Sequence, residues 1–258
     1  MIKLILSGCN GRMGRAITDI VSKTPNAEIV AGVDLNTDSS CGYPVYATIE
    51  EVTESADVLI DFSHPALLSG LLAYCRDHKL PAVIATTGCS DEQLAEIDEV
   101  SKTVPMFRSG NMSLGINVLL MLVERAAKIL GDTFDVEVIE RHHNQKIDAP
   151  SGTALMIADR LKDALPHQAE LVYDRHTVRQ KRGYQEIGMH SLRGGTIVGV
   201  HEVVFAGRDE VVELKHEAQS REVFAAGAVK AALFLTGVRT PKLYNMDDLV
   251  ATVMSDKL

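Results

Sequence analysis

Two imidazoles and one ammonium group lie within five residues of one another, at His142, His143 and Lys146. A Pro-Ser-Gly-Thr sequence follows at residues 150–153. Proline disfavours helical geometry at the residue before it, so a helix is not expected to begin earlier. Ser151 is a favourable N-cap, and apolar residues then recur with helical spacing. The pattern therefore predicts a helix that begins beside three side chains able to carry protons.

The first turn of this predicted helix, residues 152–155, contains no acidic side chain, although carboxylates are usually favoured there. Its free backbone N–H groups and the positive end of the helix dipole would attract an anion. His142 and Lys146 could donate protons to the molecule that carries the anion. We interpret the stretch as an anion-binding site with acid–base groups. The alternative is a polar strand-to-helix loop with exposed histidines.

A second motif, near the N-terminus, is a variant of the dinucleotide-binding fingerprint. A short strand is expected at residues 2–6, then a loop in which Gly8, Gly11 and Gly14 form G-x-x-G-x-x-G, and then a helix. The first glycine permits a tight turn, the second lets a pyrophosphate approach, and the third allows close helix–strand packing. Asn10 replaces the usual second glycine, and asparagine tolerates left-handed geometry at modest cost.

An acidic residue at the expected distance strengthens this interpretation. Asp34 ends a second predicted strand, residues 28–33, and lies twenty residues beyond Gly14. This is the usual position of the carboxylate that binds a ribose hydroxyl in dinucleotide-binding folds. Strand, glycine loop, helix and acid together therefore predict a dinucleotide cofactor.

Composition excludes several other classes of function. The chain has 258 residues, 46% of them hydrophobic, and a net charge of −9, which argues against a general nucleic-acid surface. No apolar run is long enough to cross a bilayer, and no signal-peptide pattern is present, so we expect a cytoplasmic protein with no membrane partner. The four cysteines have neither C-x-x-C nor zinc-site spacing, so neither disulfides nor a metal site are expected.

Strands and helices alternate in the first part of the chain, which implies a parallel sheet with right-handed crossovers. Further strands are expected at residues 56–62, 82–85 and 104–107, and helices at about 65–78 and 91–102. Ligands bind at the carboxyl ends of strands in such sheets. Three small polar loops follow these strands, at residues 61–65, 85–88 and 109–113, and could line a cofactor channel or be ordinary turns.

From Ser113 onward the pattern becomes that of an α+β domain. It predicts a helix at 114–130, an alternating strand at 135–140, a hairpin of strands at 196–206 and 210–218, and a helix at 222–235 that returns to the first domain. The polar segment 166–190 is predicted to be irregular, as a mobile loop or an oligomer arm. The expected fold class is α/β: a Rossmann-like doubly wound parallel sheet with a second α+β domain of mixed or antiparallel sheet. A dinucleotide-binding domain is expected at 1–112, completed by 223–258, and a substrate-binding and oligomerisation domain at 113–222.

The residues resemble the family of 4-hydroxy-tetrahydrodipicolinate reductases, also called dihydrodipicolinate reductases, of bacterial lysine and diaminopimelate synthesis. The family's stretch E-x-H-H-x-x-K-x-D-x-P-S-G-T-A is present in full from Glu140 to Ala154. The resemblance extends over nearly the whole chain and includes the segments 8–14, 61–63, 86–88, 111–113, 193–195 and 243–249.

The resemblance implies an NADH- or NADPH-dependent reductase of a small cyclic dicarboxylate that forms a homotetramer. It implies an acid–base role for His142, a proton-donor role for Lys146 and a substrate contact for His143. The substrate carboxylate is expected at Ser151, Gly152 and Thr153. The expected cofactor-binding residues are Gly8, Cys9, Asn10, Gly11, Arg12, Met13, Asp34, Phe62, Ala85, Thr86, Thr87, Ser109, Gly110, Asn111 and Met112.

Two positions depart from the family pattern. Leu35 follows Asp34 where the family often has an arginine that can meet a 2′-phosphate, so we expect a preference for NADH, or at best use of both cofactors. Arg12 and Arg15 are the alternative partners for such a phosphate. Val200 stands where the family commonly has glutamate, and the role of this side of the site is left open.

Two other functions are compatible with the same layout. One is another two-domain dehydrogenase acting on an amino acid or a semialdehyde, which the His-His-x-x-Lys pattern disfavours. The other is a nucleotide-sensing protein that kept the fold and lost catalysis. Such a protein should have lost the catalytic residues, whereas His142, His143 and Lys146 are all present.

Overall fold

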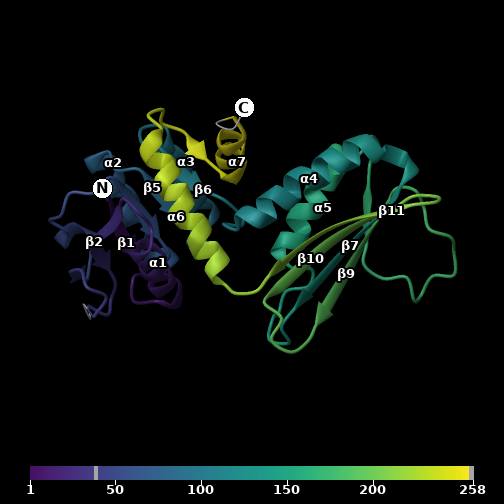
Figure 1. Cartoon of the computed structure of the whole chain (residues 1–258), viewed down its shortest axis with the longest axis horizontal. Coiled ribbons are helices and arrows are strands. Elements are labelled where there is room, and N and C mark those ends of the chain that lie inside the picture. Colours follow the sequence, from purple (N-terminus) through teal and green to yellow (C-terminus); the bar gives the residue numbers. More distant parts are fainter. Residues whose placement is uncertain (38–39, 256–258) are drawn as a thin grey trace. The chain divides into compact units, whose positions relative to one another are not determined.

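The computed structural model describes residues 1–37 and 40–255, which form two compact units (Figure 1). The first unit consists of Met1–Ser113 together with Glu222–Leu258, and the second of Leu114–Arg221. The boundaries expected from the sequence differ from these by one residue each. The second unit is thus an insertion into the first, and the first is built from two separate segments of the chain.

The first unit contains a seven-stranded sheet in which all neighbouring strands are parallel. Its order is β12-β6-β5-β4-β1-β2-β3. The chain runs from β1 to β2 on one side and returns to β4 on the other, so the switch point where ligands bind lies at the carboxyl ends of β1 and β4. The strands are β1 (Ile2–Ser7), β2 (Ala27–Val33), β3 (Val45–Tyr46), β4 (Val58–Asp61), β5 (Ala82–Ile84), β6 (Met106–Arg108) and β12 (Leu243–Tyr244).

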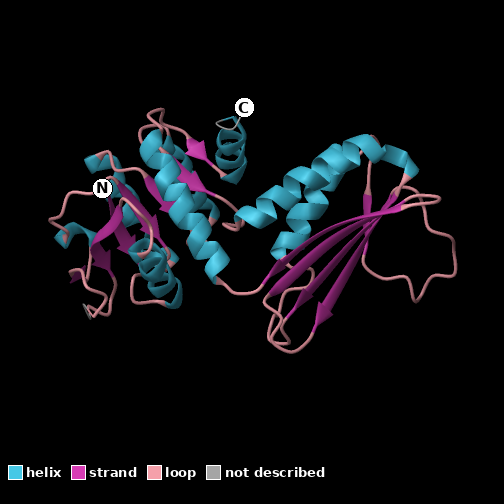
Figure 2. Cartoon of the chain, in the orientation of Figure 1, coloured by secondary structure: helices cyan, strands magenta, loops and turns pink. Residues whose placement is uncertain are grey.

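Helices pack on this sheet, as a Rossmann-like fold requires (Figure 2). The predicted capping box is confirmed: Ser90 Oγ accepts a hydrogen bond from the Gln93 amide, and Gln93 Oε1 accepts one from the Ser90 amide. The helix after β12 was not predicted. The helices of this unit are α1 (Arg12–Ser22), η1 (Ile49–Glu51), η2 (Pro65–Leu67), α2 (Leu68–His78), α3 (Asp91–Ser101), α6 (Glu222–Gly237) and α7 (Met246–Ser255), and α6 packs against α1, β4 and β5.

The second unit has a mixed five-stranded sheet in the order β11-β10-β7-β9-β8, which confirms the expected α+β character. β7 pairs antiparallel with β10 and parallel with β9, and the predicted hairpin is the antiparallel pair β10–β11. The helix predicted at 114–130 has those bounds. The elements are α4 (Leu114–Leu130), η3 (Gly131–Thr133), β7 (Asp135–His142), α5 (Gly152–Ala164), β8 (Glu170–Val172), β9 (Glu186–Arg193), β10 (Gly199–Ala206) and β11 (Val211–Ala218).

The prediction that 166–190 is irregular throughout was wrong. β8 lies inside this segment, and β9 begins in it and occupies an interior place in the sheet, between β7 and β8. Only Ile187, Gly188 and Met189 of β9 are buried, while its second half is polar or exposed. The apolar run was therefore too short to be recognised, and the parallel partner that stabilises the strand lies about fifty residues earlier in the sequence.

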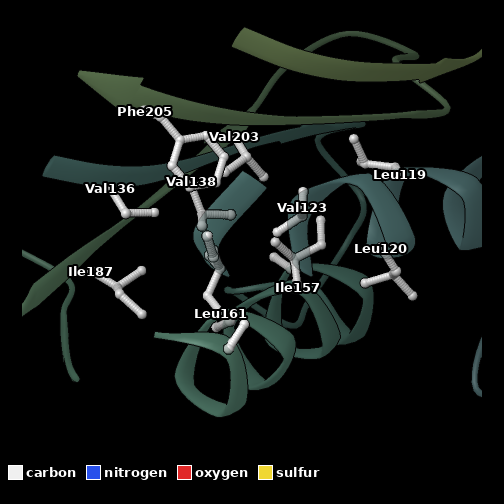
Figure 3. Packing of buried hydrophobic residues seen from close by; sticks show 14 of the residues in the cluster. Leu119, Leu120, Val123, Val136, Val138, Ile157, Leu161, Ile187, Val203 and Phe205 are labelled. Atoms are coloured by element: carbon white, nitrogen blue, oxygen red, sulfur yellow. The ribbon is translucent and has the colours of Figure 1, made fainter. Parts of the chain in front are cut away.

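The core of the second unit explains how the segment from Glu140 to Ala154 is positioned. Alternate side chains of β7 are buried, beginning with Val136 and Val138, and they pack against α4 and α5 (Figure 3). Because side chains along a strand point to opposite faces in turn, the same buried face continues to Glu140 and His142. β7 thus places the acid Glu140 and the imidazole of His142 at its carboxyl end.

Candidate active site

A buried acid–imidazole pair lies at the end of β7. The exposed fraction is 1% for Glu140 and 7% for His142, and His142 Nδ1 lies 2.6 Å from Glu140 Oε2. An ionised carboxylate can only accept hydrogen bonds, so Nδ1 carries the proton and Nε2 is the free ring nitrogen. The imidazole is therefore held in one tautomer.

Arg193, the last residue of β9, keeps this carboxylate charged. Its NH1 and NH2 groups donate to Glu140 Oε2 and Oε1 at 2.8 and 2.7 Å. Burial by itself would raise the pKa of Glu140, but hydrogen bonds from Arg193 and then His142 hold it at about 2. Burial also lowers the pKa of His142, against the opposing effect of Glu140, so this imidazole is mainly neutral near pH 7.

The start of α5 is attached to the same pair. The Ser151 amide donates to Glu140 Oε1 at 3.1 Å. Ser151 is the predicted N-cap: its Oγ accepts a hydrogen bond from the Ala154 amide and lies 3.0 Å from His201 Nε2. The first turn of α5 contains no acidic side chain, as expected. Gly152, at the first position of α5, is exposed and Thr153 is half-buried, so this helix end can be approached from solvent.

One carboxylate of the chain itself lies close to this helix end. Asp148 Oδ1 is 2.9 Å from Lys146 Nζ. The hydrogen bond from Lys146 is the main reason that the pKa of Asp148 is lowered, and the Gly152 amide contributes in the same direction. Lys146 and the start of α5 thus both interact with a carboxylate that belongs to the chain itself.

The loop between β7 and α5 also brings together groups that the sequence did not connect. Gly194 N donates to the His142 carbonyl, and Asn144 N donates to the carbonyl of Gly195, which fixes the loop against the end of β9. His143 Nε2 lies 3.4 Å from an Arg221 guanidinium nitrogen. The participation of Arg221 was missed because no motif surrounds it and it lies 78 residues from His143.

Val200 lies away from this cluster. It pairs with Arg141 of β7, and the pairing of β10 therefore places it on the face opposite to Glu140 and His201. Gly199 is the residue of β10 beside the imidazole, since a Cβ there would lie 3.1 Å from His142 Nε2. The substitution of the family's glutamate at 200 therefore does not place a different side chain against the acid–imidazole pair.

The glycine loop of the first unit has the geometry of a dinucleotide-binding turn. Gly8 has a φ of +76°, and a Cβ there would lie 2.7 Å from the Phe62 carbonyl oxygen. A Cβ at Gly14 would overlap the carbonyl oxygens of Gly8 and Cys9. Gly11 is the N-cap of α1, whose first turn has no acidic residue. The backbone can thus approach a phosphate group at this helix end.

The acid at the end of β2 is bound to this loop. Asp34 Oδ2 accepts a hydrogen bond from the Asn10 amide at 2.9 Å, and Oδ1 accepts one from the Asn36 amide at 3.0 Å. Asn10 does not use left-handed geometry: among the described residues other than glycine, only Asn26 and Lys79 have a positive φ.

A pocket of about 430 Å³ opens at the carboxyl ends of the central strands of the first unit. It brings together nine residues that the sequence assigned to the cofactor: Met13, Phe62, Ala85, Thr86, Thr87, Ser109, Gly110, Asn111 and Met112. Ser63 and Phe224 complete the wall, and Phe224 was missed because α6 carries no nucleotide motif. The other assigned residues, Gly8, Cys9, Asn10, Gly11, Arg12 and Asp34, lie outside this wall.

Cys9 is wholly buried beneath the glycine loop, and burial raises the pKa of its thiol to about 12. Its side chain therefore packs in the interior and can offer a ligand only its main chain. Over residues 1–37 and 40–255, no group of three or more His, Cys, Asp or Glu side chains could hold a metal ion. Over the same ranges, no helix has the length and apolar character needed to cross a bilayer.

Comparison with known proteins covers almost the entire chain. A family model described as dihydrodipicolinate reductase, N-terminus, matches residues 2–112, and one described as dihydrodipicolinate reductase, C-terminus, matches residues 115–250. The chain is 54% identical over 250 residues to the 4-hydroxy-tetrahydrodipicolinate reductase of Caldanaerobacter subterraneus, covering 97% of this chain and 98% of the relative. It is 49% identical over 247 residues to the Clostridium tetani protein of the same name, covering 96% of each.

A solved structure supports the same assignment. The dipicolinate-bound dihydrodipicolinate reductase from Paenisporosarcina sp. TG-14 matches with a TM-score of 0.79 and 26% identity, over 95% of this chain and 97% of that chain. The chain belongs to the dihydrodipicolinate reductase family.

Proposed function

We propose that this chain reduces 4-hydroxy-tetrahydrodipicolinate to tetrahydrodipicolinate with NADH or NADPH, in the synthesis of diaminopimelate and lysine. Membership of the family makes it an NAD(P)H-dependent oxidoreductase. The ligand named for the Paenisporosarcina relative, dipicolinate, is a cyclic dicarboxylate, as is the proposed substrate. The observation that carries the proposal is that one buried carboxylate, that of Glu140, holds both His142 and the N-cap of α5, with Lys146 in the loop between them.

The first unit fits a dinucleotide. The loop around Gly8 and Gly14 leaves no room for side chains, so backbone amides can approach a pyrophosphate at the start of α1. Asp34 presents a carboxylate for ribose hydroxyls, and Met13 with Phe62 gives the adjoining pocket an apolar wall. A bound reduced nicotinamide supplies the hydride.

The second unit provides the groups that bind and protonate the substrate. The amides of Gly152 and Thr153 and the positive end of α5 attract one ring carboxylate, with His143 as a neighbouring hydrogen-bonding group. Lys146 Nζ carries protons and can neutralise charge as the ring is reduced. His142 Nε2 is the nitrogen free to exchange a proton. Asp148 has to leave the Lys146 ammonium before a substrate carboxylate can take its place.

We propose NADH as the better cofactor. The Asp34 carboxylate repels a 2′-phosphate, and the side chain that follows it, Leu35, is 83% exposed and cannot offset this repulsion. Arg15 is not well placed to do so either, because its Nε donates to the Asn10 carbonyl. The family resemblance also implies a homotetramer, which we propose for this chain.

The test is a steady-state assay with freshly generated substrate, followed by loss of reduced-nicotinamide absorbance. We expect turnover with both cofactors and a higher kcat/KM with NADH. Lys146→Ala and His142→Ala should fold and bind NADH but lose most turnover. Near-normal turnover in either variant would refute its proposed role, and a clearly higher kcat/KM with NADPH would refute the cofactor preference.

A further inference from the structure

We propose that Glu140 is a positioning residue of the reductase, which fixes both the His142 imidazole and Ser151, the N-cap of α5, through one buried carboxylate that Arg193 keeps charged. The inference rests on the proposed roles of His142 and of α5. It adds a residue that touches neither substrate nor cofactor but determines where both substrate-binding groups lie.

The carboxylate is fully used by partners within the second unit. Oε2 accepts from His142 Nδ1 at 2.6 Å and from Arg193 NH1 at 2.8 Å. Oε1 accepts from Arg193 NH2 at 2.7 Å and from the Ser151 amide at 3.1 Å. Each oxygen therefore accepts at least two hydrogen bonds, and the Ser191 side chain donates a further one to the same carboxylate. Because these donors surround it, the Glu140 carboxylate can adopt essentially one orientation.

Stability alone does not account for an acid at this place. The preceding residues on the same buried face of β7 are Val136 and Val138, so an apolar residue would continue the core. Burying an ion pair commonly contributes little net stability compared with apolar residues of similar size. The acid and Arg193 are therefore better explained by what they hold in place.

The first group held is the imidazole. The accepting carboxylate fixes the proton on Nδ1, so that Nε2 is free. Gly199 lies beside this nitrogen and has no side chain to cover it. The charged or titratable groups around the ring are Glu140 from β7, Lys146 from the following loop, Arg193 from β9 and His201 from β10.

These neighbours leave Glu140 as the group that favours the imidazolium. Burial lowers the pKa of His142 most, and the charges of Lys146 and Arg193 lower it further. His201 lies in edge-to-face contact, with ring centroids 5.1 Å apart, and burial lowers its pKa to about 3, so it is neutral. Removal of the Glu140 charge should therefore shift the titration of His142 to lower pH.

The second group held is the carboxylate-binding end of α5. Glu140 fixes the Ser151 amide, and the Ser151 hydroxyl in turn caps the helix at Ala154. A small displacement of this helix end would move the amides of Gly152 and Thr153 together. Substitution of Glu140 should consequently affect both proton transfer and substrate binding, which are otherwise provided by different segments.

The test variant is Glu140→Gln, which preserves shape but removes the charge and places an amide NH₂ among donors. We expect kcat to fall about 10- to 100-fold, as is typical when a supporting partner is lost. KM for the substrate should rise, NADH binding measured by titration should be unchanged, and the pH profile of kcat should move to lower pH. This direction holds whether His142 acts as acid or base, because both limbs follow its pKa.

The matched control is Glu137→Gln. It lies on the same strand, on the opposite face, and is also ion-paired, with Arg182. Its pH profile should be that of the unaltered protein. A direct measurement needs no variant: nitrogen-15 NMR of the imidazole should show the Nδ1–H tautomer of His142.

An Nε2–H tautomer, or a Glu140→Gln variant with unchanged kcat and pH profile, would overturn the inference. If Glu140→Gln does not fold, the tautomer decides the question. Absence of reductase activity in the unaltered protein would instead refute the proposed function. The two failures are therefore distinguishable.

Discussion

The exposed leucine after Asp34 gives a direct test of how this chain chooses between its cofactors. Asp34 is fixed by the amides of Asn10 and Asn36, so its carboxylate cannot easily turn away from a 2′-phosphate. Leu35 is 83% exposed, so a longer charged side chain can replace it without disturbing the core. The substitution Leu35→Arg should therefore improve the use of NADPH specifically.

The expected gain in kcat/KM for NADPH follows from the exposure of residue 35 to solvent. Two unit charges about 4 Å apart in water interact by about 1 kcal/mol, and exposed ion pairs contribute about 0.2–1 kcal/mol. A phosphate carries up to about two charges, which offsets part of the cost of holding a flexible arginine. We expect a net gain of about 1 kcal/mol, which corresponds to about fivefold in kcat/KM for NADPH. The value for NADH should change less than about twofold, because it has no 2′-phosphate.

The assay compares kcat/KM for NADPH and NADH at low and high salt. The gain for NADPH should decrease as salt rises, since exposed charges are screened. Leu35→Gln is the matched control, because it has a polar side chain of similar reach and no charge, and it should leave the ratio unchanged. An equal gain in Leu35→Gln, or none in Leu35→Arg, would contradict the reasoning.

Three further outcomes are expected. Phe205→Ala should lower the free energy of unfolding by about 3–5 kcal/mol in urea titrations, because Phe205 is wholly buried in the core of the second unit. A loss below about 1 kcal/mol would mean that this core is not closely packed. Gly14→Ala should weaken NADH binding at least about tenfold in fluorescence titrations, because the new methyl group overlaps two carbonyl oxygens of the glycine loop; unaltered binding would contradict this geometry. The pKa of His201 is lowered by burial from 6.5 to about 3, so between these values only the unfolded chain binds the proton. The free energy of unfolding should therefore fall as pH decreases from 6.5 towards 3, by up to about 1.4 kcal/mol per pH unit from this group, and less steeply in His201→Asn. Equal slopes in the two proteins would refute this assignment.

The sequence predicted best where local signals were strong. The helix at 114–130 has a long apolar periodicity, α3 has both members of a capping box, and β7 alternates in burial along its length. The hydrogen-bonding role of Ser151 as an N-cap could likewise be read from its position after Pro150. In each case the information lies within a few residues.

The parts that could not be predicted depend on distant partners. β9 has only a short buried run and is stabilised by parallel pairing with β7. In the pairing of β7 with β9, Arg193 lies opposite His142, and this brings its guanidinium to Glu140. Because the sequence did not predict β9, it did not predict this contact either. Phe224 in the cofactor pocket is a similar case, since its helix returns to the first unit after the whole insertion.

The insertion of the second unit into the first also sets the order in which the two units can fold during synthesis on the ribosome. Residues 114–221 leave the exit tunnel as one continuous piece and can collapse on their own. The sheet of the first unit, in contrast, lacks its edge strand β12 and the packing of α6 until nearly the entire chain has been synthesised. The incomplete sheet of the first unit is therefore exposed to aggregation while the second unit is translated.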